Sequence, residues 1–170
     1  VLRATRSIAM PGAVGNVARN VAALGGRARL AGVVGQDAAG QELAALIATE
    51  PGIDDFVEAR AGAATIVKTR FVAAGQQLLR LDDEADGRRE IEASTAFSES
   101  SVILLSDYAK GGVGEKAIRA ALNSGAPVIV DPKGRDFARY GAVDVIKPNA
   151  GELAAATGLP VATDAEVEAA

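Results

Sequence analysis

Three of the five lysines in this chain come just after short apolar segments that are typical of buried strands. The lysines are Lys110, Lys133 and Lys147, and the segments are 102–105, 128–130 and 143–146. Ligands of open α/β sheets bind at the carboxyl ends of the strands, and lysine binds phosphate as a point charge. The spacing therefore predicts a site for an anion, most simply phosphate, although lysine also favours loops that bind nothing.

Carboxylates and an amide accompany these lysines. Asp107 and Asp131 follow the first two apolar segments, where each can accept hydrogen bonds from a polyhydroxyl ligand or join a metal–water network. Capping of the following turn explains either residue equally well. Asn149 and Glu152 have the spacing of a helix capping box, which needs no ligand. The same helix N-terminus also attracts phosphate or its metal, so both interpretations stay open.

Two further groups of polar residues are candidates for ligand binding. Asn16 lies in a glycine-rich loop that opens a helix, where it either contacts a ligand or caps the helix. Lys68, Arg70 and Arg80 lie on two alternating segments around a turn at 73–76. These segments predict a β-hairpin whose charges either reach over an anionic substrate or simply face solvent.

The composition excludes several kinds of chemistry. The chain has 170 residues, a formal charge of −4, and no His or Cys. It therefore has no imidazole base, no thiolate and no disulfide. The negative charge argues against a nucleic-acid partner, and no apolar run approaches the ~20 residues of a membrane span. We expect a cytoplasmic protein with small-molecule partners.

The remaining pattern predicts an α/β fold with a mostly parallel sheet covered on both faces. Expected helices span 14–24, 38–48, 114–123 and 149–157, and a first strand spans 29–34. The hairpin would be an appendage, a lid or an interface element, within about 57–82. The chain begins at Val1, not at Met, within a segment of mixed polar and apolar residues, and it ends where a helix begins at 164–170. We therefore expect a partial domain cut at both ends.

A rival pattern is the Gly-x-Gly-x-x-Ala run from Gly112 to Ala117, which matches a dinucleotide fingerprint. Asp131 lies about where a ribose-binding acid would sit. However, the segment 107–111 lies between the preceding strand and the first glycine of the run, so the tight strand-to-glycine turn is lost. An NAD(P)-dependent oxidoreductase is the remote alternative.

Taken together, these motifs resemble the ribokinase-like (PfkB) sugar kinases over essentially the whole chain. Within that family they are most similar to the bacterial heptose 7-phosphate kinases, found alone or as the first domain of a bifunctional protein of ADP-heptose synthesis. The segments that carry the resemblance are 16–18 with Gly25 and Gly35, 67–70, 76–82, 106–111, 131–137 and 147–152.

The resemblance implies a ribokinase-like three-layer sandwich with a β-hairpin lid that also pairs subunits into a homodimer. It implies transfer of the ATP γ-phosphate to the anomeric hydroxyl of D-glycero-D-manno-heptose 7-phosphate, towards lipopolysaccharide core. ATP would be bound by Lys147, Asn149, Ala150, Gly151 and Glu152, with Glu152 holding Mg²⁺ through water. The sugar phosphate would be bound by Asn16, Lys68, Arg70, Arg80, Asp107, Lys110, Asp131 and Lys133.

Two features differ from the family pattern. Ala13 and Val14 follow Gly12 where the family has a glycine pair, and Gly15 is the nearest replacement. The family's opening strand with its substrate-binding Asp, and its Gly-Ala-Gly-Asp segment with the catalytic base, are not found between Val1 and Ala170. The base is expected beyond Ala170, and this stretch alone is expected to be inactive. The alternatives are a kinase for another sugar and a non-catalytic binding fragment.

Overall fold

The computed structural model describes residues 3–84, 90–92 and 95–170. The chain forms two compact units, Val1–Gly87 and Arg88–Ala170. Each unit has its own apolar core. Within the described ranges, no helix has both the length and the apolar character needed to cross a bilayer.

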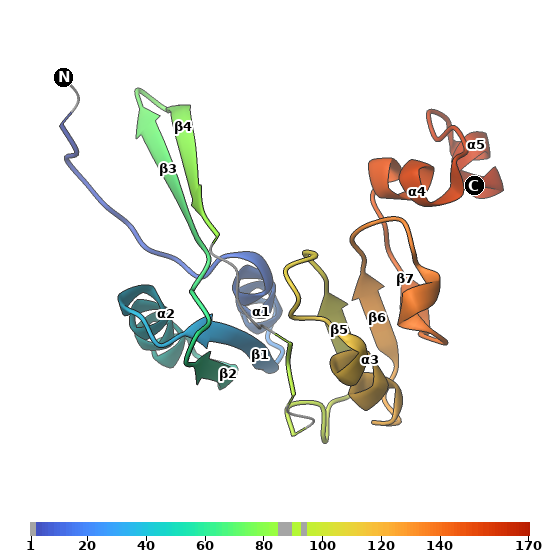
Figure 1. Ribbon diagram of the computed structural model, residues 1–170, viewed down its shortest axis with the longest axis horizontal. Helices are drawn as coiled ribbons and strands as arrows, with labels where there is room; N and C mark the ends of the chain where they lie inside the picture. The colour runs from blue at the N-terminus through green and yellow to red at the C-terminus, as the bar shows by residue number, and fades with distance from the viewer. Residues whose placement is uncertain (1–2, 85–89, 93–94) are drawn as a thin grey trace. The chain divides into compact units, whose positions relative to one another are not determined.

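The first unit contains a parallel pair of strands with two helices packed against it (Figure 1). Its elements are α1 (Ala13–Ala23), β1 (Ala28–Gly35), α2 (Ala38–Ala48) and β2 (Ile53–Arg60). Ala18 of α1, Leu30 of β1 and Ile47 of α2 form the buried core. The two helices and β1 were predicted from the sequence to within one residue at each end.

Strand β2 was not predicted, and the expected start of the hairpin near residue 57 is too early. Val57 belongs to β2 and pairs with Gly32 of β1. Acidic residues at Asp54, Asp55 and Glu58 interrupt the apolar alternation that would reveal a strand. The strand forms because all of its residues pair with β1, an interaction that the local sequence pattern does not reveal.

Asp37 and Thr65 connect the start of α2 to the segment that leads into the hairpin. The Asp37 side chain caps α2 by accepting the N–H of Gly40 at 2.8 Å. It also accepts the N–H of Thr65 at 2.8 Å and its hydroxyl at 2.7 Å. The Thr65 hydroxyl in turn accepts the N–H of Gly35 at 3.0 Å. These bonds hold Thr65, two residues before the hairpin begins at Val67, against the end of β1 and the start of α2.

The hairpin consists of β3 (Val67–Ala73) and β4 (Gln76–Asp83), paired antiparallel. Ala74 and Gly75 form the turn, with φ of 49° and 78°. Positive φ at both central residues suits the right-handed twist of the two strands. The predicted hairpin is confirmed, and its turn lies within the predicted four residues.

The second unit contains a three-stranded parallel sheet in the order β5-β6-β7 (Figure 1). The strands are β5 (Ile103–Ser106), β6 (Val128–Asp131) and β7 (Val145–Ile146). The helices are α3 (Glu115–Leu122), the 3-10 turn η1 (Ala138–Tyr140), α4 (Ala150–Thr157) and α5 (Asp164–Ala169). Every predicted strand and helix of this unit is present, and η1 is additional.

Alternate residues of β5 and β6 build the core of the second unit. Ile103, Leu105, Val128 and Val130 are each at most 4% exposed, and Tyr140 of η1 is fully buried against them. In contrast, Leu104 and Val145 remain 41% and 48% exposed. Within the described residues of this unit, the sheet is therefore covered more completely on one face than on the other.

The Asp37 carboxylate makes a testable contribution to the pH dependence of stability. Hydrogen bonds from the Thr65 N–H, then from its hydroxyl and from the Gly40 N–H, lower the pKa of Asp37. A lowered pKa stabilises the fold above the unfolded value, near 3.9, and this stability is lost as the pH falls through the folded value. We expect Asp37→Asn to be destabilised relative to wild type most strongly above about pH 4.

Urea unfolding of both proteins between about pH 2 and 7 measures this difference. Glu42→Gln, which removes an exposed carboxylate from the same helix, is the control. A difference between wild type and Asp37→Asn that stays constant over the whole pH range would contradict this role for Asp37.

Candidate active site

In the first unit, Asn16 lies exposed in α1 and does not cap it. The N-cap is Gly12, whose carbonyl accepts the N–H of Asn16 at 3.3 Å. The capping alternative for Asn16 is therefore wrong, and Asn16 is an exposed residue in the first turn of the helix. Ala13 begins the helix with a φ of 44°. A left-handed backbone, which glycine favours, is thus kept where the family pattern has glycine.

The hairpin presents a charged face and an apolar face. Cross-strand partners share a face of a two-stranded sheet. Lys68 is paired with Asp82, and Arg70 with Arg80, on one side. The opposite side carries four exposed apolar residues, Val67, Phe71, Leu79 and Leu81, together with the polar partners Thr69 and Asp83.

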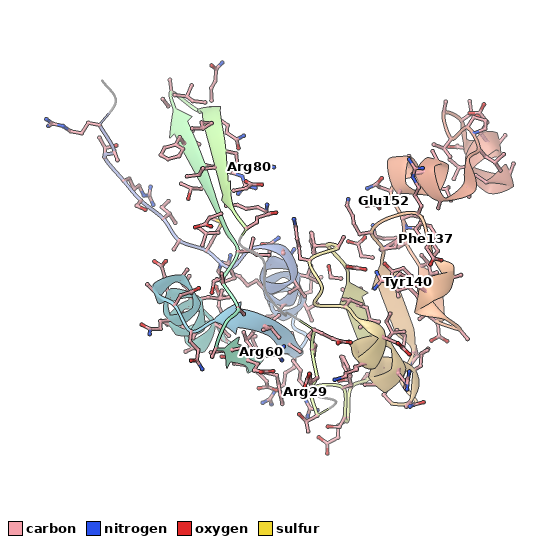
Figure 2. All side chains as sticks on the ribbon, in the orientation of Figure 1. Arg29, Arg60, Arg80, Phe137, Tyr140 and Glu152 are labelled. Carbon is pink, nitrogen blue, oxygen red and sulfur yellow. The ribbon has the colours of Figure 1, made fainter. Side chains whose placement is uncertain are left out.

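The charged face contains more cations than carboxylates. Lys68 Nζ lies 2.7 Å from Asp82 and also pairs with Glu84, and Arg80 Nε lies 2.8 Å from Asp82. These bonds raise the pKa of Lys68 and lower that of Asp82. Among the described residues, Arg70 has no ion-pair partner, and it lies directly opposite Arg80. Like charges in direct opposition are destabilising, and an anion placed between them would relieve this cost. Figure 2 shows Arg80 projecting from β4.

In the second unit, the carboxyl ends of the parallel strands carry two lysine–carboxylate pairs. Lys147 Nζ lies 3.2 Å from Asp131 Oδ1, and Lys133 Nζ lies 2.9 Å from Glu152 Oε1. A backbone hydrogen bond ties the end of β7 to β6, since the Lys147 N–H donates to the carbonyl of Val130 at 2.8 Å. The structure therefore brings these four residues together in two pairs, as the spacing predicted, and their role in binding a ligand stays a prediction.

Helix α4 begins with a complete capping box beside these pairs. The Glu152 N–H donates to Asn149 Oδ1, and the Asn149 N–H donates to Glu152 Oε2, both at 2.9 Å. The Asn149 N–H, and then Lys133, lower the pKa of Glu152, and Glu152 raises the pKa of Lys133. Ala150 and Gly151 follow the cap, and the first N–H groups of a helix have no carbonyl partner within it. Figure 2 labels Glu152 at the start of α4.

Asp107 and Lys110 lie in the loop after β5 but in different environments. Lys110 is exposed, whereas Asp107 is only 4% exposed. The carboxylate of Asp107 accepts hydrogen bonds from Ala109, Arg139 and Tyr140. Arg139 and Tyr140 were not among the candidates from the sequence. They follow the segment 131–137 that carries the family resemblance, and no local pattern in the sequence distinguishes them as site residues.

The N-terminus of α3, where the dinucleotide fingerprint would hold a pyrophosphate, is occupied by a protein carboxylate. Glu90 Oε1 accepts the N–H of Lys116 at 3.1 Å. A Cβ added to Gly114, the N-cap of α3, would collide with the Glu90 side chain. Residues 107–114 separate β5 from this helix. These features argue against a dinucleotide site here.

Lysines and carboxylates at the carboxyl ends of a parallel sheet, beside a capped helix N-terminus, fit an enzyme class that handles phosphate groups. The sequence matches the pfkB family carbohydrate kinase over residues 4–170, and the chain belongs to this family. The fold class predicted from the sequence is thereby confirmed. Arabidopsis thaliana ribokinase, solved with ribose and ATP, has a TM-score of 0.77 at 23% identity, and the match covers 99% of this chain and 58% of that one. Escherichia coli phosphofructokinase-2 in complex with potassium has a TM-score of 0.71 at 24% identity, covering 99% and 59% of the two chains.

More similar in sequence are proteins named bifunctional protein HldE. That of Gluconacetobacter diazotrophicus is 46% identical over 180 residues, which is 99% of this chain and 37% of the relative. That of Caulobacter sp. strain K31 is 47% identical over 173 residues, which is 96% of this chain and 36% of the relative. The chain thus spans little more than a third of the length of these relatives.

The lysine–carboxylate pair at the start of α4 can be tested without any ligand. We expect Lys133→Gln to raise the pKa of Glu152, because the cation that stabilises the carboxylate is removed. The pKa should remain below the ordinary value, since the larger cause, the Asn149 N–H, is retained. A ¹³C NMR titration of the Glu152 carboxyl measures the shift. Lys116→Gln, which breaks the exposed pair with Glu92, is the matched control and should leave Glu152 unchanged. A Glu152 pKa that does not move in Lys133→Gln would contradict the pairing.

Proposed function

We propose that the full-length protein transfers the γ-phosphate of ATP to the anomeric hydroxyl of D-glycero-D-manno-heptose 7-phosphate. The product would be the 1,7-bisphosphate, a precursor of ADP-heptose for lipopolysaccharide core, made in the cytoplasm. The family and the HldE relatives support this choice of substrate. The structural observation that carries it is the cluster of Lys133, Lys147 and the capped N-terminus of α4 beyond the parallel strands.

On the nucleotide side, we propose that the N-terminus of α4 binds the ATP phosphates. The N–H groups of Ala150 and Gly151 would donate to phosphate oxygens, and the Lys147 ammonium would neutralise their charge. The Asn149–Glu152 capping box fixes the direction of these N–H groups. No group of three or more His, Cys, Asp or Glu residues suited to a metal lies in the described part of the chain. Glu152 Oε1 would hold a magnesium ion through water in place of its bond to Lys133, because Mg²⁺ keeps several of its waters, while Oε2 stays in the capping box.

On the sugar side, we propose that seven polar or charged residues bind the acceptor. In the first unit these are Asn16, Lys68, Arg70 and Arg80, and in the second unit Lys110, Asp131 and Lys133. Arg70 and Arg80, opposed on the hairpin, suit the dianionic phosphate of a sugar phosphate. Asp131 provides an acceptor for a sugar hydroxyl when Lys147 turns to a phosphate. Because Lys133 and Lys68 are already paired with carboxylates, phosphate must compete with these partners.

The hairpin is proposed as a lid that also joins two copies of the protein. Its charged face would cover the acceptor, and its exposed apolar face, made of Val67, Phe71, Leu79 and Leu81, would pack against a second copy. A homodimer buries these side chains, which would otherwise remain in water.

The proposed reaction is tested with the full-length protein, ATP, Mg²⁺ and a panel of acceptors. We expect the 7-phosphate of D-glycero-D-manno-heptose to give the 1,7-bisphosphate, and hexose 6-phosphates and unphosphorylated heptose to react at least about tenfold less efficiently. If the folded protein makes no bisphosphate but phosphorylates another sugar, the proposed substrate is wrong and the protein is a family kinase for that sugar. Ligand binding without any turnover would favour a non-catalytic role.

The opposed arginines give a second, residue-level outcome in the same assay. Arg70→Ser should raise KM for the sugar phosphate about tenfold, since a charge-assisted contact to phosphate is lost. KM for ATP should change little. Arg27→Ser, which breaks an exposed pair with Asp54 away from the hairpin, is the control. Equal changes in both KM values would contradict a contact with the acceptor.

A further inference from the structure

One buried carboxylate ties together two loops of the second unit, the loop after β5 and the loop after β6. Asp107 Oδ1 accepts the backbone N–H of Ala109 at 2.7 Å. Asp107 Oδ2 accepts Arg139 Nη1 at 2.6 Å and the Tyr140 hydroxyl at 2.8 Å. Both oxygens of Asp107 are therefore occupied by donors from the protein itself, and the residue is only 4% exposed. This carboxylate is therefore placed to organise the loops and not to contact a ligand directly.

Tyr140 connects this carboxylate to the loop after β6. Its hydroxyl donates to Asp107 and accepts the backbone N–H of Lys133 at 3.2 Å. The ring is fully buried in the core, and Figure 2 labels Tyr140 among the side chains of the second unit. Burial, and to a smaller extent Asp107, raise the pKa of Tyr140, so its hydroxyl keeps its proton and stays a donor. The backbone of Lys133 is thereby held at a fixed position relative to Asp107.

Arg139 closes the loop after β5 at both of its ends. Its Nη1 binds Asp107 at the start, and its Nη2 donates to the carbonyl of Val113 at 2.9 Å near the end. Its guanidinium also lies 5.1 Å from the centre of the Tyr140 ring. Between these ends the backbone is left-handed at Ala109, with a φ of 55°, and at Gly111, with a φ of 81°. A non-glycine residue in this conformation needs support from its surroundings, and the Asp107 bond to Ala109 supplies it.

We infer that Arg139 and Tyr140 are positioning residues that act through Asp107. They hold the two loops that carry Lys110 and Lys133, so that both ammonium groups start from fixed backbone positions at the strand ends. The ligand in question, a phosphorylated sugar, rests on the function proposed above. The effect on the loops themselves does not depend on that function.

The first measurement is amide hydrogen exchange of the full-length protein, for which no substrate is needed. Tyr140→Phe removes only the hydroxyl and keeps the ring in the core. We expect the Lys133 amide, which loses its acceptor, to exchange about tenfold faster. The Asp107 amide donates to the carbonyl of Asp131 in the sheet at 2.9 Å and should not change. An unchanged Lys133 amide would overturn the inference, and so would equal acceleration of both amides, which marks general loosening.

The second measurement is steady-state kinetics of Tyr140→Phe and Arg139→Lys. We expect KM for the sugar phosphate to rise about tenfold in each variant, while KM for ATP and the melting temperature change little. Arg119→Lys on the surface of α3, where Arg119 pairs with Glu115, is the matched control and should behave as wild type. An unchanged acceptor KM in both variants would overturn the inference. Wild-type protein that phosphorylates no sugar would refute the proposed function instead, and the exchange data would still decide the loop-holding role.

Discussion

The backbone positions of the two loops that carry Lys110 and Lys133 depend on the burial of a single charge, the carboxylate of Asp107. Burying a carboxylate is costly unless its oxygens are satisfied. Here they bind Ala109, Arg139 and Tyr140, which come from the loop beside Asp107 and from η1. The requirement to satisfy one buried charge thus fixes two loops at once. The exposed lysines on these loops can then vary their side-chain positions while their backbones stay in place.

Protein carboxylates also neutralise the lysines of both units when no ligand is bound. Lys133 pairs with Glu152, Lys147 with Asp131, and Lys68 with Asp82 and Glu84. All these lysines remain at least 37% exposed, so each pair is weak and can exchange its carboxylate for a phosphate. Arg70 differs from these three lysines, since its cross-strand partner is Arg80 and not a carboxylate.

Most of the fold could be predicted from the sequence because its signals are local. Helix α2 has an Asp cap and an apolar face, the hairpin has alternating strands around Ala74-Gly75, and α4 has a capping box at Asn149. Strand β2 could not be predicted, because its order comes from pairing with β1. For Asp107 the sequence left a ligand contact and a cap of the following turn open, and the bond from the Ala109 N–H confirms the cap. Its partner Arg139 could not be predicted, because it is 32 residues away and is brought close only by the fold.

The central claim is that phosphate binds at the carboxyl ends of β5, β6 and β7, beside the N-terminus of α4. A crystal structure of the full-length protein with a non-hydrolysable ATP analogue tests it most directly. We predict phosphate oxygens within hydrogen-bond distance of the Ala150 and Gly151 amides, with the Lys147 ammonium turned from Asp131 towards them. An analogue bound elsewhere, with the pairs Lys147–Asp131 and Lys133–Glu152 both intact, would contradict the account.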